Sequence, residues 1–400
     1  MRRLGEGRSA RPWLGYWPEV ADEPAVEPRR EALTLVAPDG AVIRGILWSP
    51  PSGTPWRVGV LLAHPRADFS THYVCAPLAA AGYAVLGIAT RSVNNDTDLV
   101  HEACALDVVT AAAELRRRGA GTLVALGNSG GGSLMALAQA GAGEVPSLDA
   151  DVFVALAAHP GEGEFLMQAI DPSVTDESDR FSVDPELDMY HPDNGWRPWP
   201  ATSSYDPGWL ERYRKAQRAR VARLDAVARS AAADRAEARE ALRATTEGSA
   251  EWSRLRRRCV AAAYLTVYRT LADPAYLDPT IDPDDRPLGS IFAAGDPLVA
   301  NYGSGGMART VSDRSWLSTW SALSSPARMA ATLPLVAAPT LVVHATGDTE
   351  IRMQQAEALR DASGAEDLSF ELVRGATHYF EGRRREVTDL LVDWLRTRVG

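Results

Sequence analysis

Residues 122–132, Thr-Leu-Val-Ala-Leu-Gly-Asn-Ser-Gly-Gly-Gly, decide how this chain is interpreted. The stretch opens with a short apolar run, Thr122–Leu126, typical of a strand buried on both faces. It closes on glycines, and the run rich in Ala, Leu and Met that follows favours a helix. Between the two, Gly127-Asn128-Ser129-Gly130-Gly131 fits the pattern G-x-S-x-G. So short a pattern also occurs by chance, so the interpretation depends on the strand before it and the helix after it.

The glycines suit a serine held on a sharp strand-to-helix turn. Side chains two residues to either side of Ser129 would collide, and Gly127 and Gly131 leave that space free. Such a turn lifts the Ser129 hydroxyl out at the carboxyl end of the sheet, beside the free N–H groups of a helix N-terminus. The alternative is a glycine-rich turn that binds phosphate, but the stretch has neither a Walker lysine nor a G-x-G-x-x-G spacing.

Strand and helix patterns alternate on both sides of this stretch. Pro38-Asp39-Gly40 predicts a hairpin turn between the first two strands. The alternation predicts a mostly parallel sheet flanked by helices, the α/β class. It stops near residue 160 and resumes at residue 340. The expected strands are 32–36, 41–48, 58–63, 83–90, 122–126, 152–158, 340–344 and 368–373. The expected helices of this part are 73–81, 101–118, the one after Ser129, 353–362 and 384–398.

The segment between these two parts reads as an insertion, because the strand pattern resumes after it. It predicts a long helix over about 209–244 and a second over about 251–271. The long helix has a narrow apolar stripe on a charged background, which favours a solvated helix; a dimerisation surface, and so a homodimer, is the alternative. We therefore divide the chain into an N-terminal arm (1–29), a first core part (30–160), a mostly helical cap (161–325) and a second core part (326–400).

A serine is a poor nucleophile unless a base activates it and an acid orients that base. His378 directly follows the last expected strand, and Asp348 lies just past the strand 340–344. Both loops are expected at the sheet edge where Ser129 emerges. Glu350 is the fallback acid, and His344, inside a strand, is expected to be a packed core residue.

The elbow at Ser129, the chain order Ser129, Asp348, His378 and the positions of their loops resemble the α/β-hydrolase fold superfamily. The resemblance covers roughly residues 30–160 and 330–400. It implies that Ser129 is the nucleophile, His378 the base and Asp348 the orienting acid, and it implies no cofactor.

The resemblance also implies an oxyanion hole that combines the Gly130 N–H with one from the loop after the strand 58–63. Many relatives have His-Gly in that loop, whereas this chain has His64-Pro65-Arg66. Proline has no N–H, so the backbone of Arg66 is the expected second donor. The further candidates for lining the pocket are His64, Asn128, His159 and Tyr379.

The insertion occupies the position at which members of this superfamily often carry a cap. It is rich in aromatic residues, some of which would form the core of the cap and others an apolar chamber for a bulky or apolar substrate. These aromatic residues are Trp196, Trp199, Tyr205, Trp209, Tyr264, Tyr268, Tyr302, Trp316 and Trp320.

Composition excludes several other classes of protein. A formal net charge of −10 argues against a nucleic-acid binder that relies on a basic field. No stretch approaches 18 apolar residues, so no membrane span is expected. The start lacks the apolar region of a secretory signal, and the three cysteines show no CxxC spacing. We therefore expect a cytoplasmic protein. The acidic loop 171–188 lacks EF-hand spacing, and no metal site is expected.

The sequence therefore predicts hydrolysis of an ester in a small-molecule acyl substrate. Amides, thioesters and lactones stay open, as do acyl transfer and carbon–carbon bond cleavage on the same triad. A binding protein with a silent triad is the last alternative.

Overall fold

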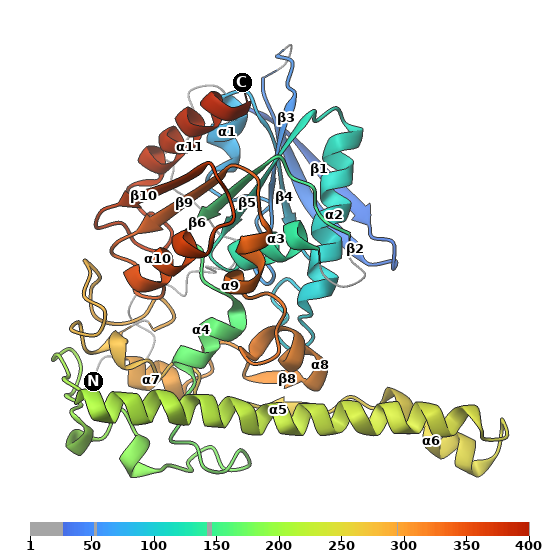
Figure 1. Ribbon diagram of the computed structural model, residues 1–400, viewed down its shortest axis with the longest axis vertical. Coiled ribbons are helices and arrows are strands. Elements are labelled where there is room, and N and C mark those ends of the chain that lie inside the picture. Colours follow the sequence, from blue (N-terminus) through green and yellow to red (C-terminus); the bar gives the residue numbers. More distant parts are fainter. Residues whose placement is uncertain (1–26, 52–53, 142–145, 294, 400) are drawn as a thin grey trace.

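The structure, a computed structural model, describes residues 27–51, 54–141, 146–293 and 295–399. Figure 1 shows a central sheet with helices on both faces, and the long helix α5 (Pro207–Arg243) lying across one end of the molecule. The arm expected over residues 1–29 falls almost wholly outside the described residues, which begin at residue 27. The first strand begins at Arg29.

Eight strands form the central sheet in the order β1-β2-β4-β3-β5-β6-β9-β10. The hairpin β1–β2 is antiparallel and β2 pairs antiparallel with β4, whereas the six strands from β4 to β10 run parallel. All the strands expected from the sequence are present, so the prediction of a mostly parallel sheet is confirmed. The strands are β1 (Arg29–Val36), β2 (Val42–Ser49), β3 (Val58–Leu62), β4 (Ala84–Ala89), β5 (Thr122–Asn128), β6 (Val152–Leu156), β9 (Thr340–Ala345) and β10 (Leu368–Val373).

The central strands β5, β6 and β9 are buried on both faces. Successive side chains of a strand point to opposite sides, so each strand contributes to two apolar clusters. In β3, Val60 and Leu62 pack into the apolar cluster that includes α1 (Cys75–Ala80) and α11 (Arg384–Val399). Leu61 packs into the opposite cluster, with α2 (His101–Arg117) and α3 (Gly130–Ala140). Two helices complete the core on this part of the chain, α9 (Met329–Thr332) and α10 (Met353–Ala362).

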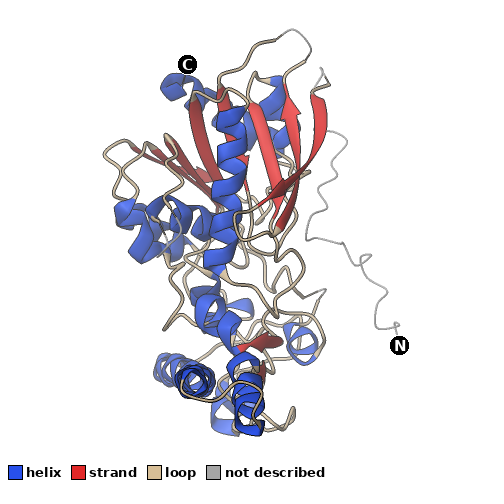
Figure 2. Cartoon of the chain, turned by 90° about the vertical axis from the view of Figure 1, so that its right-hand side faces the viewer, coloured by secondary structure: helices blue, strands red, loops and turns tan. Residues whose placement is uncertain are grey.

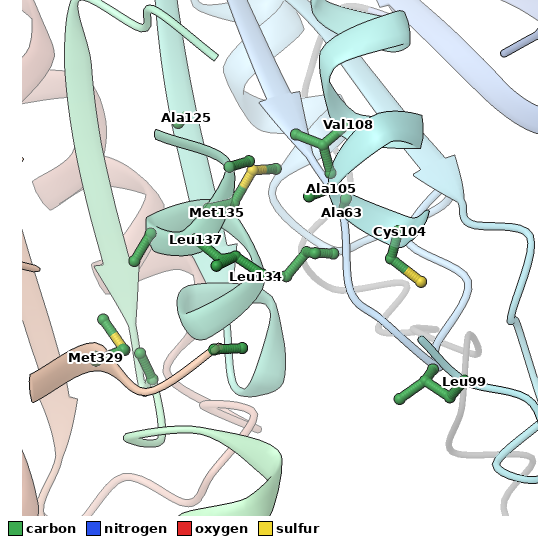
Figure 3. Close-up of a cluster of buried hydrophobic side chains, with 14 of the residues drawn as sticks. Ala63, Leu99, Cys104, Ala105, Val108, Ala125, Leu134, Met135, Leu137 and Met329 are labelled. Atoms are coloured by element: carbon green, nitrogen blue, oxygen red, sulfur yellow. The ribbon is translucent and has the colours of Figure 1, made fainter. Parts of the chain in front are cut away.

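Helix α3, which follows the candidate nucleophile, lies deep in the core. Leu134, Met135 and Leu137 pack into the same buried cluster as Ala125 of the sheet and Met329 of α9 (Figure 3). Because the helix is buried around its circumference, the turn that leads into it is held rigidly by packing.

The cap contains more irregular structure than expected. Figure 2 shows its small two-stranded sheet apart from the central one. The second helix, expected over 251–271, is shorter than predicted: it ends at Val260, and Tyr264–Thr266 forms a strand. These β-favouring residues pair antiparallel with Thr310–Ser312, a partner too distant for a local pattern to indicate. The cap elements besides α5 are α4 (Glu162–Ala169), α6 (Ala250–Val260), β7 (Tyr264–Thr266), α7 (Pro297–Tyr302), β8 (Thr310–Ser312), α8 (Asp313–Ser315), the π-helical turn Trp316–Trp320 and the short 3₁₀ turns Pro185–Leu187, Pro192–Asn194 and Pro274–Tyr276.

Helix α5 is well capped and only partly solvated. Asp206 accepts a hydrogen bond from the Trp209 N–H (2.9 Å) at its start. Of the expected stripe, Tyr213, Val221 and Leu224 are buried and Leu210 is half-buried. Beyond the body of the molecule, α6 folds back along α5 and shares a small apolar cluster with it (Figure 1).

The cap is joined to the core by a buried ion pair network next to α10. Asp273 accepts hydrogen bonds from Arg214 of α5 (2.6 Å) and from Arg352 at the start of α10 (2.6 Å). Burial by itself would raise the pKa of Asp273, but the two guanidinium groups hold it at about 2.

The three cysteines, Cys75, Cys104 and Cys259, are buried free thiols. None of the helices in the described ranges has both the length and the apolar character needed to cross a membrane.

Candidate active site

Five site residues follow five neighbouring parallel strands. His64 comes after β3, Ser129 after β5, His159 after β6, Asp348 after β9 and His378 after β10. Parallel strands all end at one edge of a sheet, so residues far apart in the sequence are gathered there.

Ser129 lies on the strained turn that the sequence predicts. Its backbone has φ 56° and ψ −128°, a region that side-chain-bearing residues rarely adopt. A Cβ on Gly127 would collide with the backbone of Gly131 and Gly132, and a Cβ on Gly131 would collide with the carbonyl oxygen of Ala63 in the loop after β3. Glycine is therefore required on both sides of the turn.

The structure brings the three expected triad residues together. The Nδ1–H of His378 donates to Oδ2 of Asp348 (2.6 Å), and Oγ of Ser129 donates to Nε2 of His378 (2.8 Å). Asp348 is itself held by the backbone N–H groups of Glu350 (2.8 Å) and Ile351 (3.1 Å), which both donate to its Oδ1. Hydrogen-bond chains of this kind activate the nucleophile in enzymes with a serine triad.

Burial and charge act in opposite directions on the pair of His378 and Asp348. Burial by itself lowers the pKa of a histidine, but the Asp348 carboxylate outweighs it and raises the pKa of His378 above its ordinary value. For Asp348, burial raises the pKa of the carboxyl, and the His378 ring outweighs that and leaves it below its usual range. The Asp348 carboxyl is therefore ionised at neutral pH, and its negative charge faces Nδ1 of His378.

Glu350, the fallback acid, makes a different set of contacts. Its Oε1 accepts from the Ile291 N–H (2.7 Å) and its Oε2 from the Tyr276 hydroxyl (3.0 Å), both in the cap. Burial raises the pKa of this carboxyl. Its oxygens are bonded to the cap, whereas the carboxylate that bonds His378 is that of Asp348.

The expected role of the Arg66 backbone does not fit the structure. Its N–H donates to Nδ1 of His64 (3.0 Å), and the N–H of Ala67 donates to the same nitrogen (3.0 Å). The ring of His64 thus closes the turn at Pro65. The Arg66 N–H, which was expected to face an oxyanion, is therefore already hydrogen-bonded. Gly130 begins α3 directly after Ser129, as predicted.

A cavity opens beside Ser129 and His378. Three of the four predicted lining residues, His64, His159 and Tyr379, do line it. Asn128 does not line the cavity and is buried. It donates to the Leu156 carbonyl (2.6 Å) and accepts from the ring of His72 (3.0 Å), and these bonds hold the turn at Ser129 in place. The remaining lining residues are Arg66, Glu162, Phe165, Phe292, Met307, Glu350 and Ile351.

The aromatic residues of the cap proposed as chamber walls lie elsewhere. None of the nine is among the residues that line this cavity. Tyr205 and Trp209 belong to the core of the cap, and Trp316 and Trp320 are fully buried in the main apolar cluster. Large aromatic side chains bury the most apolar area, which explains why these four residues pack into cores.

Glu162, which is not among the residues expected at the site from the sequence, lies in the first turn of α4 and is only 1% exposed. The spacing His159-x-x-Glu162 directly after a strand was the available signal. A Cβ placed on Gly130 would meet Glu162 Oε1, His159 Nε2 and His64 Nε2, all within 3.0 Å. Burial raises the pKa of the Glu162 carboxyl, but the neighbouring imidazoles of His159 and His64 and the Arg66 guanidinium outweigh it and lower that pKa below its usual range.

No group of three or more His, Cys, Asp or Glu side chains suited to a metal ion occurs in the described part of the chain.

Comparison with known proteins supports the fold. The alpha/beta hydrolase GrgF from Penicillium sp. sh18 is similar with a TM-score of 0.52 and 12% identity, over 92% of this chain and 98% of that one. A hypothetical protein from Pseudomonas aeruginosa is similar with a TM-score of 0.51 and 13% identity, over 98% and 99% of the two chains. Searches with protein-family models and among curated proteins gave no match. The sheet order, the elbow and these likenesses together show that this chain has the α/β-hydrolase fold.

Proposed function

We propose that this protein is a serine hydrolase that cleaves an ester or a related acyl bond through an acyl-enzyme intermediate. The observation that carries the proposal is the unbroken chain of hydrogen bonds from Asp348 through His378 to Ser129 on a strained elbow.

The geometry supports a two-step reaction. Ser129 Oγ attacks the acyl carbon while Nε2 of His378 takes its proton, and the same proton then goes to the departing alcohol as the carbon–oxygen bond breaks. Water next gives a proton to Nε2 and attacks the acyl-enzyme, and that proton returns to Oγ as the acid leaves. The Asp348 carboxylate holds Nδ1–H throughout and stabilises the imidazolium that forms in each step.

We further propose that the acyl group carries a hydrogen-bond donor next to the carbonyl, in place of the bulky apolar group expected from the sequence. Most of the side chains that line the cavity are polar. Glu162 Oε1 is buried and has no hydrogen-bond partner among the described residues. An unpaired buried carboxylate oxygen is costly, and a hydroxyl or ammonium group of the substrate would satisfy it.

Fluorophosphonate labelling tests the nucleophile. We expect wild-type protein to be labelled and the label to lie on Ser129, while the Ser129→Ala variant, which keeps the fold, takes up no label and hydrolyses nothing. Hydrolysis that survives in Ser129→Ala would refute the proposal. Parallel assays with an anilide, a thioester and a lactone, with and without an alcohol acceptor, assign the bond type and separate hydrolysis from acyl transfer.

Three methyl esters of nearly equal size test the acyl group: propionate, glycolate and glycinate. A hydrogen bond to a charged group contributes about 1.5–3 kcal/mol, so kcat/KM for glycolate or glycinate should exceed that for propionate by roughly 10- to 100-fold. The Glu162→Gln variant should reduce the preference for glycinate. Because the preference is a ratio measured on one variant, the amount of folded enzyme cancels. A preference for longer apolar esters that persists in Glu162→Gln would contradict this assignment.

A further inference from the structure

The oxyanion hole of this site lacks its expected second donor. Pro65 has no N–H, and the N–H of Arg66 already donates to Nδ1 of His64. A tetrahedral intermediate that forms on Ser129 bears a negative oxygen, and loss of one of its donors typically lowers kcat by about 10²–10³. A second donor from another source would therefore matter to the reaction.

The ring of His64 has its single proton on a defined nitrogen. Because Nδ1 accepts from two backbone N–H groups, those of Arg66 and Ala67 at 3.0 Å each, its lone pair is occupied and the proton belongs on Nε2. Burial lowers the pKa of His64 to about 3, so the ring is neutral at working pH. His64 thus offers one N–H in one orientation.

The Nε2–H of His64 lies near the backbone N–H of Gly130, the other expected donor. Nε2 of His64 is 3.0 Å from the place where a Cβ on Gly130 would lie. This place is about 2.5 Å from the Gly130 nitrogen, so the two nitrogens are at most about 5.5 Å apart. One oxygen can accept at about 2.9 Å from both. His64 lines the same cavity as Ser129, and no acceptor for Nε2–H is present among the described residues.

We propose that the Nε2–H of His64 and the N–H of Gly130 form the oxyanion hole, so that a side chain supplies the donor that the loop backbone cannot. The proposal rests on the proposed function, because it needs a tetrahedral intermediate on Ser129. The two loop amides hold the ring in place before the reaction, so the donor needs no reorganisation when the charge develops.

The neighbouring charges make this donor more important. Glu162 Oε1 lies close to the same point beside Gly130, and a carboxylate there opposes an oxyanion. The ring of His159, whose Nε2 is 3.5 Å from Glu162 Oε2, and the guanidinium of Arg66 offset part of that charge. An oxyanion without a donor at His64 would face the remaining charge of the carboxylate with one hydrogen bond fewer.

Two substitutions of His64 separate the two ring nitrogens. In His64→Asn the side-chain oxygen can accept from the loop amides, as Nδ1 does, but no N–H reaches as far as Nε2. In His64→Gln an N–H reaches that far while the acceptor for the loop is lost. We expect His64→Asn to lower kcat by about 10²–10³ with KM changed less than about threefold, and His64→Gln to recover at least tenfold of that loss. Thermal unfolding of both variants reports the role of the ring in the loop.

A purely structural His64 predicts the reverse order: His64→Asn active, and His64→Gln impaired in proportion to its loss of stability. That result overturns the inference while hydrolysis by the wild type leaves the proposed function standing. If the wild type neither hydrolyses an acyl substrate nor takes up a fluorophosphonate, the proposed function fails and this inference fails with it.

A measurement on the unsubstituted protein covers the case in which His64→Asn does not fold. With ¹⁵N-labelled histidine, the Nε2–H proton resonance of His64 should move downfield when a boronic acid forms a tetrahedral adduct on Ser129. A resonance that stays in place as the adduct forms overturns the inference.

Discussion

Replacing Asp348 by asparagine should remove most of the activity while leaving the fold in place. Oδ1 of Asp348 accepts from the backbone N–H groups of Glu350 and Ile351, so the single oxygen of an asparagine is drawn to that position. The amide NH₂ then faces Nδ1 of His378, where the carboxylate oxygen lies at 2.6 Å. A donor there forces Nδ1 to accept, which moves the ring proton to Nε2. A protonated Nε2 cannot take the proton of Ser129.

The size of the loss follows from the alternative open to the asparagine. Turning its oxygen toward His378 would restore the ring proton but leave two buried backbone N–H groups unpaired, at about 1–3 kcal/mol each. A cost of about 2–6 kcal/mol corresponds to a loss of roughly 30-fold to 10⁴-fold. Loss of tautomer control in other serine triads lowers kcat by about 10⁴, which agrees with the upper end.

The assay is kcat/KM for the best ester between pH 5 and 9, with urea unfolding as the measure of stability. The residual activity of Asp348→Asn should also have its midpoint at lower pH, because the carboxylate that raises the pKa of His378 is gone. Glu350→Gln is the matched control, since the Glu350 oxygens bond the cap. Near-wild-type turnover in Asp348→Asn, with loss in Glu350→Gln, would refute the reasoning and make Glu350 the acid.

Three further predictions concern the base, the elbow and the cap. The wild-type kcat/KM should rise with pH to a plateau, with a midpoint above about 6.5, because a base must be neutral to act and the pKa of His378 is raised. Gly131→Ala should lower the free energy of unfolding in urea by about 1–3 kcal/mol, since its Cβ would collide with backbone. Trp316→Phe should lower the same quantity by about 1–3 kcal/mol, because the buried Trp316 Nε1–H donates to Asp225 at 2.8 Å.

Each of these has a clear contrary result. A flat pH profile between pH 5 and 9 would argue against His378 as the base. Gly121→Ala is the control for the elbow, because its Cβ would meet nothing closer than 3.7 Å; equal effects of the two glycine substitutions would remove the steric explanation. For the cap, an effect of Trp316→Phe within about 0.5 kcal/mol, the range of ordinary surface changes, would show that the bond to Asp225 contributes little.

The grouping of Ser129, Asp348 and His378 was predictable because its determinants are local and share one edge of the sheet. Each of these residues lies at or shortly after the end of a strand whose apolar pattern is visible in the sequence, and parallel strands end together. The contacts of Asp348 with His378 and of His378 with Ser129 agree with that expectation.

The contacts of the loop after β3 were less predictable. The sequence alone shows that Pro65 lacks an N–H. The hydrogen bonds from the Arg66 and Ala67 N–H groups to His64 depend on the conformation of the loop, which only the structure shows. The position of the His64 ring relative to Gly130 depends on how the loop after β3 packs against α3.

The cap shows where sequence reasoning stops. Within the insertion, helical periodicity identified α5, but the end of α6 and the strand at 264–266 depend on pairing with residues 310–312. Four of the aromatic residues that suggested an apolar chamber, Tyr205, Trp209, Trp316 and Trp320, pack into cores instead, and Glu162 takes a place in the cavity wall.

The sequence by itself therefore determined the sheet, the elbow and the order of the triad, because these follow from the periodicity of buried strands and from the steric needs of Gly127 and Gly131. Only the tertiary structure decided which side chains line the cavity, which loop amides are bonded to His64 and which carboxylate oxygen has no hydrogen-bond partner among the described residues. Those outcomes arise where groups distant in the sequence compete for the same space and for the same hydrogen-bond partners, and no local pattern records that competition.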